Sequence, residues 1–257
     1  MPPPVDLYSL ATVPIEQFFN GTALGNATGF VWQTGSRYFL VTNWHVVTGR
    51  RFPRGQYLRK DAARPNKLRL LLNQRTLTFG KVECDVAIRD TDDLPLWWAH
   101  PARNVDVVVL QLPLDGNEPA INMYPVNSLA SSNLRLQIGM DVFILGYPFG
   151  APPPGLPVWK RGSIASEPEL TQLTTDYMLV DTASRAGMSG SPVIRRSWGT
   201  HLLDNGTKVD DGQTATRFVG IYSGRLHTAL RIDAQLGIVW PRRIIEEIIA
   251  GGRRDND

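Results

Sequence analysis

A serine enclosed by glycines is the sharpest chemical signal in the sequence. Ser189 lies in the hexapeptide GMSGSP, residues 187–192, and its glycines permit backbone conformations that larger side chains block. A tight bend there would expose the serine hydroxyl. If the amides of Gly187 and Ser189 point the same way, they form a two-donor site for the oxyanion that develops when a carbonyl is attacked. The same residue types populate ordinary turns, so the hexapeptide alone leaves both interpretations open.

A serine nucleophile needs a base, and histidine is the most frequent one. His45 follows the apolar run 39–42 through Asn43 and Trp44, which places it where a strand ends and a side chain can face a cleft. A lone histidine is more often structural, so this candidate depends on its partners. The other histidines lie in a polar loop or in charged stretches that we expect to be exposed: His100, His201 and His227.

The base in turn needs an orienting acid. Asp106 stands at the entrance of the apolar run 107–110, where burial of a carboxylate is costly unless a partner accepts it. An imidazole is a suitable partner. Asp85 has a similar position before residues 86–88 and is the rival candidate. Asp106 is favoured because the run that follows it is longer and more uniformly apolar.

Short apolar segments that could position these residues recur along the chain. They are rich in valine, isoleucine and aromatic residues and are broken by Gly, Pro, Asn and Asp, which is typical of strands. Their number predicts an all-β fold, either a sandwich or barrels. The predicted strands lie within residues 28–33, 38–42, 67–72, 105–112, 140–147, 178–181, 191–194, 217–223 and 237–240.

One helix is predicted, at residues 241–251. A proline at its start and glycines at its end mark its limits, and four isoleucines share one face: Ile244, Ile245, Ile248 and Ile249. Residues 123–136 are polar and lack a strong period, so we interpret them as a connection. The chain then divides into two halves of short strands, 1–125 and 126–257, which suits a pair of small barrels.

Composition excludes several classes of protein. The chain has 257 residues, 42% apolar and 20% charged, which is typical of a globular protein. No apolar run is long enough to span a membrane as a helix. The 27 basic and 24 acidic residues give a formal charge of +3. The basic residues are scattered and form no stripe interleaved with aromatic residues, so nucleic acid is not an expected partner.

Cysteine content and the first residues bear on the compartment. Cys84 is the only cysteine, so no internal disulfide and no cysteine cluster for zinc can form. The start of the chain has neither a basic leader nor an apolar core of the kind found in secretory signal peptides. We therefore expect a reducing, cytoplasmic location.

The candidate residues carry a resemblance when they are taken in order. The segments TNWHV (42–46), VDVVVL (105–110) and GMSGSP (187–192) occur in the order His, Asp, Ser, which is the chymotrypsin-type order. The chain resembles trypsin-like serine peptidases of the bacterial kind, akin to the glutamyl endopeptidases and heat-shock proteases. Further matching segments are 146–148, 161–164, Asp181 and 218–224. The resemblance implies two packed antiparallel six-stranded barrels followed by a C-terminal helix.

The resemblance also implies a role for each residue. His45, Asp106 and Ser189 would form the catalytic triad, and the amides of Gly187 and Ser189 would form the oxyanion hole. Such a mechanism uses no metal and no cofactor. By position in the motifs, the residues that would bind substrate are Ala183, Ser184, Tyr222, Ser223 and Gly224.

Some positions depart from the family pattern. Asn43 and Trp44 replace small residues before the histidine, so their bulk could narrow the cleft. No carboxylate occupies the position that selects basic residues, and Tyr222 stands where glutamyl endopeptidases have a histidine. We therefore predict a neutral, small-to-medium apolar residue before the scissile bond. Arg185 and Arg225 lie nearby and could instead attract an acidic side chain.

The leading hypothesis is a serine endopeptidase that acts on a protein substrate. A catalytically silent trypsin-like binding module is the alternative, because a fold does not imply its activity. Gating of the serine loop, residues 185–189, by an activating partner protein is left open by the sequence.

Overall fold

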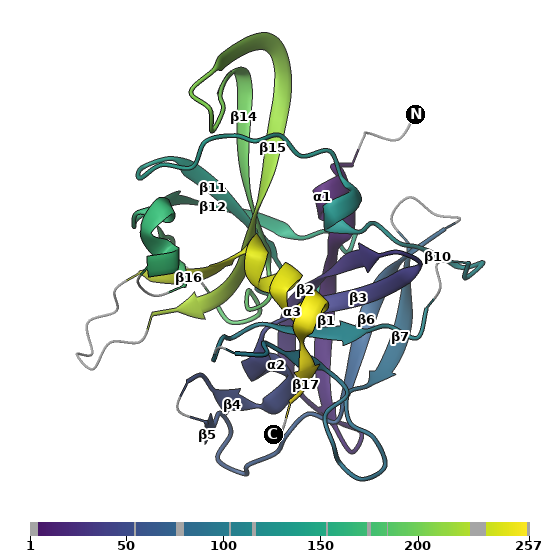
Figure 1. The fold of residues 1–257 in the computed structure, drawn as a ribbon. Helices are drawn as coiled ribbons and strands as arrows, with labels where there is room; N and C mark the ends of the chain where they lie inside the picture. Colours follow the sequence, from purple (N-terminus) through teal and green to yellow (C-terminus); the bar gives the residue numbers. More distant parts are fainter. Residues whose placement is uncertain are drawn as a thin grey trace.

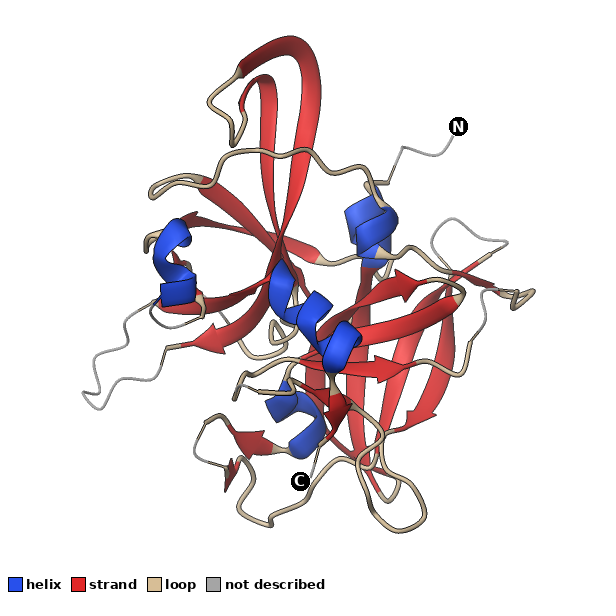
Figure 2. Ribbon diagram, viewed as in Figure 1, coloured by secondary structure: helices blue, strands red, loops and turns tan. Residues whose placement is uncertain are grey.

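The computed structural model describes residues 5–53, 55–75, 80–102, 104–114, 117–152, 154–173, 176–183, 185–226 and 235–255. Within these residues the chain forms a nine-stranded antiparallel sheet and a closed six-stranded antiparallel barrel (Figures 1 and 2). The sheet is built mainly from the amino-terminal half, and the barrel from the carboxy-terminal half. The predicted all-β class is confirmed.

The amino-terminal sheet follows the period of two that its sequence predicts. Leu68, Leu70 and Leu72 point to one face and are buried, whereas Arg69 points to the other face and pairs with Asp85 on the next strand. The strands are β1 (Thr12–Phe19), β2 (Thr22–Thr34), β3 (Arg37–Thr42), β6 (Lys67–Gln74), β7 (Lys81–Ala87), β8 (Trp98–Ala99), β9 (Val108–Gln111), β10 (Ile121–Asn122) and β17 (Arg253–Arg254). Their order is β10-β6-β1-β2-β3-β9-β8-β17, with β7 paired to β6. The described sheet exceeds the expected six strands because short segments such as β8, β10 and β17 extend its edges.

The carboxy-terminal barrel closes in the order β11-β12-β13-β16-β15-β14. Two of its strands are much longer than the barrel wall needs, and they project from it as a hairpin (Figure 1). The strands are β11 (Asp141–Gly146), β12 (Val158–Ile164), β13 (Met178–Asp181), β14 (Pro192–Leu202), β15 (Lys208–Arg225) and β16 (Leu236–Pro241). The domain boundary after residue 125 stays a prediction.

The helices are short, and none of those described is long and apolar enough to cross a membrane. They are α1 (Leu7–Ala11), α2 (Trp44–Thr48), α3 (Arg242–Gly251) and the 3-10 turns η1 (Val126–Ser128) and η2 (Pro168–Leu173); a two-stranded sheet, β4 (Arg50–Arg51) with β5 (Gln56–Tyr57), lies beside α2. The predicted C-terminal helix is confirmed as α3, which lies between the two halves in Figure 1.

One apolar cluster joins the two halves. It contains Phe30 and Phe39 of the first sheet, Phe218 of the second barrel and the isoleucines of α3. The ring of Phe30 meets that of Phe218 edge-on at 5.4 Å. Separate clusters fill the first sheet and the second barrel. Because the joining cluster is buried, separation of the halves would expose it to water.

After α3 the chain returns to the first sheet. Arg253 and Arg254 of β17 pair with Ala99 and Trp98 of β8. The carboxylate of Asp255 then accepts hydrogen bonds from two indoles, Nε1 of Trp44 at 2.7 Å and Nε1 of Trp97 at 3.1 Å. The C-terminal segment is thereby fixed against the half of the molecule that it does not follow in sequence.

The apolar face of α3 gives a first test of this packing. Ile248 is fully buried and Ile249 only partly, although both lie on the predicted face. We expect Ile248→Ala to lower the free energy of unfolding by about 2 to 5 kcal/mol, because it leaves a cavity between the halves. Ile249→Ala should cost clearly less. Urea unfolding followed by tryptophan fluorescence measures both, and equal losses would contradict the burial seen here.

Candidate active site

His45 and Asp106 are brought together by the pairing of β3 with β9. Thr42 of β3 lies opposite Val108 of β9, so the residues just after one strand meet those just before the other. His45 is in α2, which starts at once after β3 and ends at Gly49 in a left-handed conformation. The imidazole Nδ1 lies 2.7 Å from Oδ2 of Asp106, and the His45 backbone amide donates to Oδ1 at 2.9 Å. The predicted base and acid therefore form a hydrogen-bonded pair.

Asp106 is buried, with only 2% of its surface exposed, and it is surrounded by donors. Besides His45, the hydroxyl of Ser223 on β15 donates to its Oδ2. The Asn43 side-chain amide donates to the Asp106 backbone carbonyl at 2.7 Å. These contacts fix the carboxylate, and a carboxylate on Nδ1 leaves the other ring nitrogen, Nε2, as the one that can accept a proton.

The rival acid is in a different environment. Asp85 lies on β7, where Lys67 and Arg69 donate to its carboxylate at 2.7 and 2.8 Å on the surface of the sheet. These hydrogen bonds hold the pKa of Asp85 below its usual range. Asp85 does not contact His45, so it takes no part in this pair.

The serine loop needs glycine at two positions. Gly187 and Gly190 have φ of +90° and +86°, a region that favours glycine. A Cβ on Gly187 would lie 2.4 Å from the carbonyl oxygen of Tyr147, and one on Gly190 would lie 1.9 Å from that of Thr28. The amide of Met188 also bonds the carbonyl of Arg185, which with Gly187 at positive φ matches a type II turn. Backbone geometry and close packing therefore both explain the motif.

Ser189 shares one groove with His45 and Asp106. The groove has a volume of about 390 Å³ and lies between the halves; it is lined by His45, Arg51, Phe52, Leu58, Asp106, Arg185, Ala186, Ser189, Ser223, Gly224, Arg225 and Ile238. No hydrogen bond joins the hydroxyl of Ser189 to the imidazole among the described residues. Such bonds are often long without substrate and tighten in the complex. The three predicted triad residues are thus in one groove, with one of the two triad hydrogen bonds formed.

The amides predicted for the oxyanion hole are open. Within the described chain, neither the Gly187 amide nor the Ser189 amide donates a hydrogen bond. The carbonyls of the same two residues are bonded, both to Thr28. Two unengaged donors next to the serine are what stabilisation of an oxyanion requires.

Thr28 is a residue of this site that sequence reasoning missed. Its hydroxyl donates to the Gly187 carbonyl at 2.7 Å and accepts from the Tyr147 amide at 3.1 Å. Its own amide donates to the Ser189 carbonyl at 2.8 Å. The side chain is fully buried, although it belongs to β2 of the first sheet and its three partners belong to the other half. A threonine in a strand gives no local signal of such a role.

The predicted substrate-binding residues are not all in the groove. Ser223 and Gly224 line it, but the Ser223 hydroxyl is engaged by Asp106, a role that the motif comparison did not assign. The Tyr222 side chain is buried in the second barrel against Gly237, where a Cβ would lie 2.3 Å from its ring. Ala183 is exposed and does not line the groove, and Ser184 lies outside the described residues.

Asn43 and Trp44 do not narrow the cleft. Asn43 is fully buried and turned toward the Asp106 backbone, and the Trp44 indole bonds Asp255 of the C-terminal segment. Neither side chain lines the groove, so the expectation that their bulk could narrow the cleft was wrong.

The remaining histidines take other roles. His100 is buried, and its Nε2 lies 2.7 Å from Glu247 of α3. His201 is buried on β14 rather than exposed, with Nε2 3.2 Å from Asp211. His227 lies outside the described residues. In the described part of the chain, no three side chains of the His, Cys, Asp or Glu type gather as a metal site would require.

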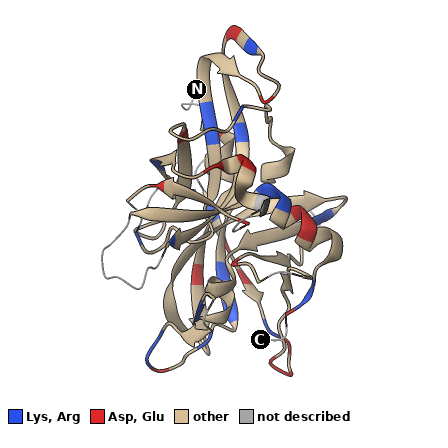
Figure 3. Cartoon of the chain, turned by 60° about the vertical axis from the view of Figure 1, so that its left-hand side comes forward, with Lys and Arg blue, Asp and Glu red and all other residues tan. Residues whose placement is uncertain are grey.

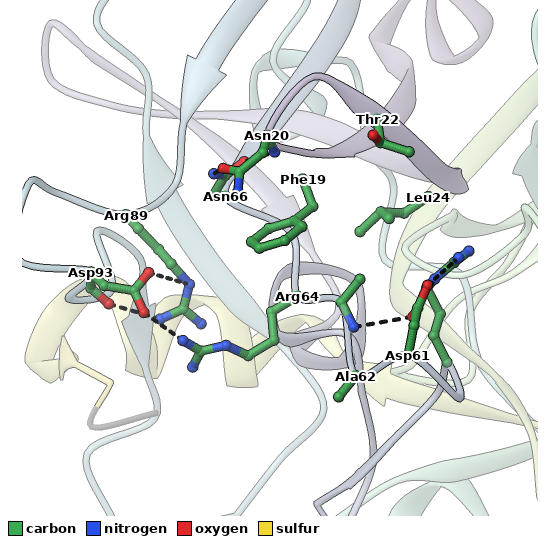
Figure 4. Close-up of a pocket in the computed structure, with 12 residues that line it drawn as sticks. Phe19, Asn20, Thr22, Leu24, Asp61, Ala62, Arg64, Asn66, Arg89 and Asp93 are labelled. Carbon is green, nitrogen blue, oxygen red and sulfur yellow. Dashed lines mark hydrogen bonds and ion pairs between the residues drawn. The ribbon is translucent and has the colours of Figure 1, made fainter.

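A larger cavity, about 640 Å³, lies away from these residues (Figure 4). It lies between the β1–β2 turn at Phe19 and Asn20 and the loops that carry Asp61 and Asp93. Its arginines are paired: Arg59 with Asp61, and both Arg64 and Arg89 with Asp93. Hydrogen bonds from Arg59 and the Ala63 amide lower the pKa of Asp61 to about 2. Its described lining contains no histidine, serine or cysteine, so this cavity offers no comparable pairing of a base with a nucleophile.

Comparisons with known proteins bear on the family and the fold of this chain. A family model described as a trypsin-like peptidase domain matches residues 27–200, more than half of the chain. No curated protein sequence matches significantly. The serine endoprotease from Yersinia pestis is similar in structure, with a TM-score of 0.51 at 13% identity over 96% of this chain and 66% of that one. The Rv3671c protease from M. tuberculosis in its active form gives 0.49 at 19% identity, over 97% and 83%. At 13% identity the likeness to the Yersinia protease shows the fold alone.

The role of Thr28 can be tested with two substitutions. Thr28→Val keeps the shape but leaves the Gly187 carbonyl and the Tyr147 amide without this partner, so we expect kcat to fall by about tenfold or more while KM changes little. Thr28→Ser keeps the hydroxyl and should retain most of kcat. Steady-state kinetics, together with Tm as a check of folding, measure the effect. A valine variant that is folded and within twofold of wild type would contradict the role.

Proposed function

This chain belongs to the trypsin-like peptidase family of serine proteases, and from that premise we propose that it cleaves a protein substrate with His45, Asp106 and Ser189 as its catalytic triad. The observation that carries the proposal is the His45–Asp106 pair, at 2.7 Å, in the same groove as Ser189. No other described histidine shares a groove with a serine held between glycines.

The proposed reaction proceeds through an acyl-enzyme. Nε2 of His45 accepts the proton of Ser189 as Oγ attacks the peptide carbonyl, and the carbonyl electrons move to its oxygen. The amides of Gly187 and Ser189 stabilise that oxyanion. The imidazolium then gives its proton to the leaving amine as the C–N bond breaks. Water, deprotonated by His45, attacks the ester and releases the new carboxylate and free Ser189.

Asp106 acts without taking the proton itself. Its carboxylate holds Nδ1–H, which fixes the tautomer, and it stabilises the imidazolium that forms in the transition state. Ser223 donates to the carboxylate, and Asn43 holds the backbone carbonyl of the same residue. We therefore propose that Asp106 orients the imidazole of His45 and stabilises its protonated form. Ser223 and Asn43 hold Asp106 in position.

The open Ser189–His45 contact bears on the second hypothesis, a silent or partner-gated module. Loop movement that completes a catalytic site on binding is common in enzymes. An activating partner therefore stays a proposal, as does the cytoplasmic location. Labelling of the isolated protein separates the alternatives directly.

An active-site probe tests the nucleophile. We expect a fluorophosphonate to label the wild type at Ser189, and Ser189→Ala to remove the label, because only an activated serine reacts readily. Ser36→Ala, which removes an exposed serine in the turn between β2 and β3, is the matched control and should label normally. Equal labelling of wild type and Ser189→Ala, read by mass spectrometry, would contradict the assignment, and absent labelling of both would favour the module.

Two matched Asp→Asn substitutions test which aspartate is the catalytic acid. We expect Asp106→Asn to lower kcat by about 10⁴, the loss known for the equivalent change in the family's type enzyme, because the amide favours the wrong tautomer. Asp85→Asn should leave kcat nearly unchanged, since Asp85 is a surface ion-pair residue. Measuring kcat on one peptide substrate suffices, and a comparable loss in both variants would refute the choice of Asp106.

A further inference from the structure

The groove that holds Ser189 has more cations than anions in its described lining. Three arginines line it, from three separate segments: Arg51 of β4 on the first half, Arg185 at the start of the serine loop, and Arg225 at the end of β15. The one carboxylate in its described lining, Asp106, is buried and already bonded by donors from both halves. The charged side chains that the described lining leaves accessible are therefore those of arginines.

Two of these arginines lack a carboxylate partner. Arg51 and Arg185 are exposed and form no ion pair with any residue in the described part of the chain. Arg185 is instead steadied by the ring of Phe149, whose centroid lies 5.8 Å from the guanidinium carbon. A cation–π contact of this kind holds the cation without an oxygen acceptor. Its N–H donors remain available to a ligand.

The rest of the molecule provides the contrast. Basic and acidic residues are interspersed over both halves (Figure 3). The arginines of the larger cavity are paired with Asp61 and Asp93, within the same lining (Figure 4). At the groove that holds Ser189, by contrast, Arg51 and Arg185 have no carboxylate partner within the described lining.

We propose that this groove selects peptide substrates with an acidic side chain beside the scissile bond, and that Arg51 and Arg185 are the specificity-determining residues. The inference rests on the proposed peptidase function and adds a substrate class to it. A guanidinium presents paired donors that match a carboxylate, and charge of one sign in a groove attracts the opposite charge. Phe52, Leu58 and Ile238 supply apolar surface in the same groove. A neutral residue before the scissile bond is thus compatible with an acidic neighbour.

A series of peptides in which a single glutamate is moved along the sequence tests the proposal. Internally quenched peptides of one sequence carry a single Glu at successive positions on either side of the scissile bond, each matched to a peptide with Gln there. We expect kcat/KM for the Glu peptide to exceed that for its Gln partner by about tenfold at one or more positions. The preference should shrink in about 0.5 M NaCl, because salt screens an exposed charge pair.

Variants then assign the preference to residues. Arg51→Gln or Arg185→Gln should reduce the Glu-over-Gln ratio at the selected position to about one or two. Lys208→Gln, in the projecting β14–β15 hairpin, removes the same unit charge far from the groove and is the matched control. Ratios within twofold at every position, or a preference that survives loss of both arginines, would overturn the proposal.

Binding to Ser189→Ala separates this inference from the proposed function. If that variant binds the Glu peptide about tenfold more tightly than the Gln peptide while the wild type cleaves neither, the charge selectivity holds and the peptidase proposal fails. If the wild type cleaves both equally, the peptidase holds and the selectivity fails. A short oligothymidine serves as a polyanion control, and tighter binding of it than of every Glu peptide would overturn the choice of an acidic peptide.

Discussion

A carboxylate removed from water must be surrounded by hydrogen-bond donors, and Asp106 obtains its donors from both halves of the chain. His45 approaches from the first half and Ser223 from the second, so both halves supply donors to the buried acid. An ionised carboxylate left with one of these donors would carry a large desolvation cost. The geometry of the site and the packing of the two halves are therefore linked.

The serine loop obeys the same constraint through the backbone. Gly190 packs so closely on the Thr28 carbonyl that any side chain there would collide with it. Thr28 in turn bonds the carbonyls that flank Met188. While the first half holds both carbonyls, the amides of Gly187 and Ser189 are left for a ligand. A loop with few contacts of its own is thus shaped by a strand of the other half.

Local sequence was sufficient for much of the fold. Alternation in residues 67–72 predicts a strand with one buried face, and the four isoleucines of α3 predict the face that packs between the halves. The Ser189, His45 and Asp106 motifs were found because each ends or begins an element and is bounded by residues with strong local preferences. The groove does bring these three together.

Contacts between distant segments were not predictable in this way. Thr28 and Ser223 act through partners more than a hundred residues away, at 159 and 117 positions. Nothing in a strand of threonine, glycine and phenylalanine reveals such a partner. The same holds for Asn43 and Trp44, whose bulk suggested an obstructed cleft until their inward orientation was seen. Edge strands of two residues, such as β17, are too short to carry a periodic signal.

The C-terminal segment connects the end of the chain back to the first half. After β10 the chain leaves the first half and forms the closed barrel. It then returns to the first half, where β17 pairs with β8 and the Asp255 carboxylate accepts hydrogen bonds from Trp44 and Trp97. A hinge motion that separated the two halves would have to break these contacts. One of them is the hydrogen bond to Trp44, the residue that precedes His45. An amino-terminal fragment produced by a cut within residues 123–136 would lack β17, the outermost strand of its sheet. Exchange of that strand between two copies would link the copies to each other.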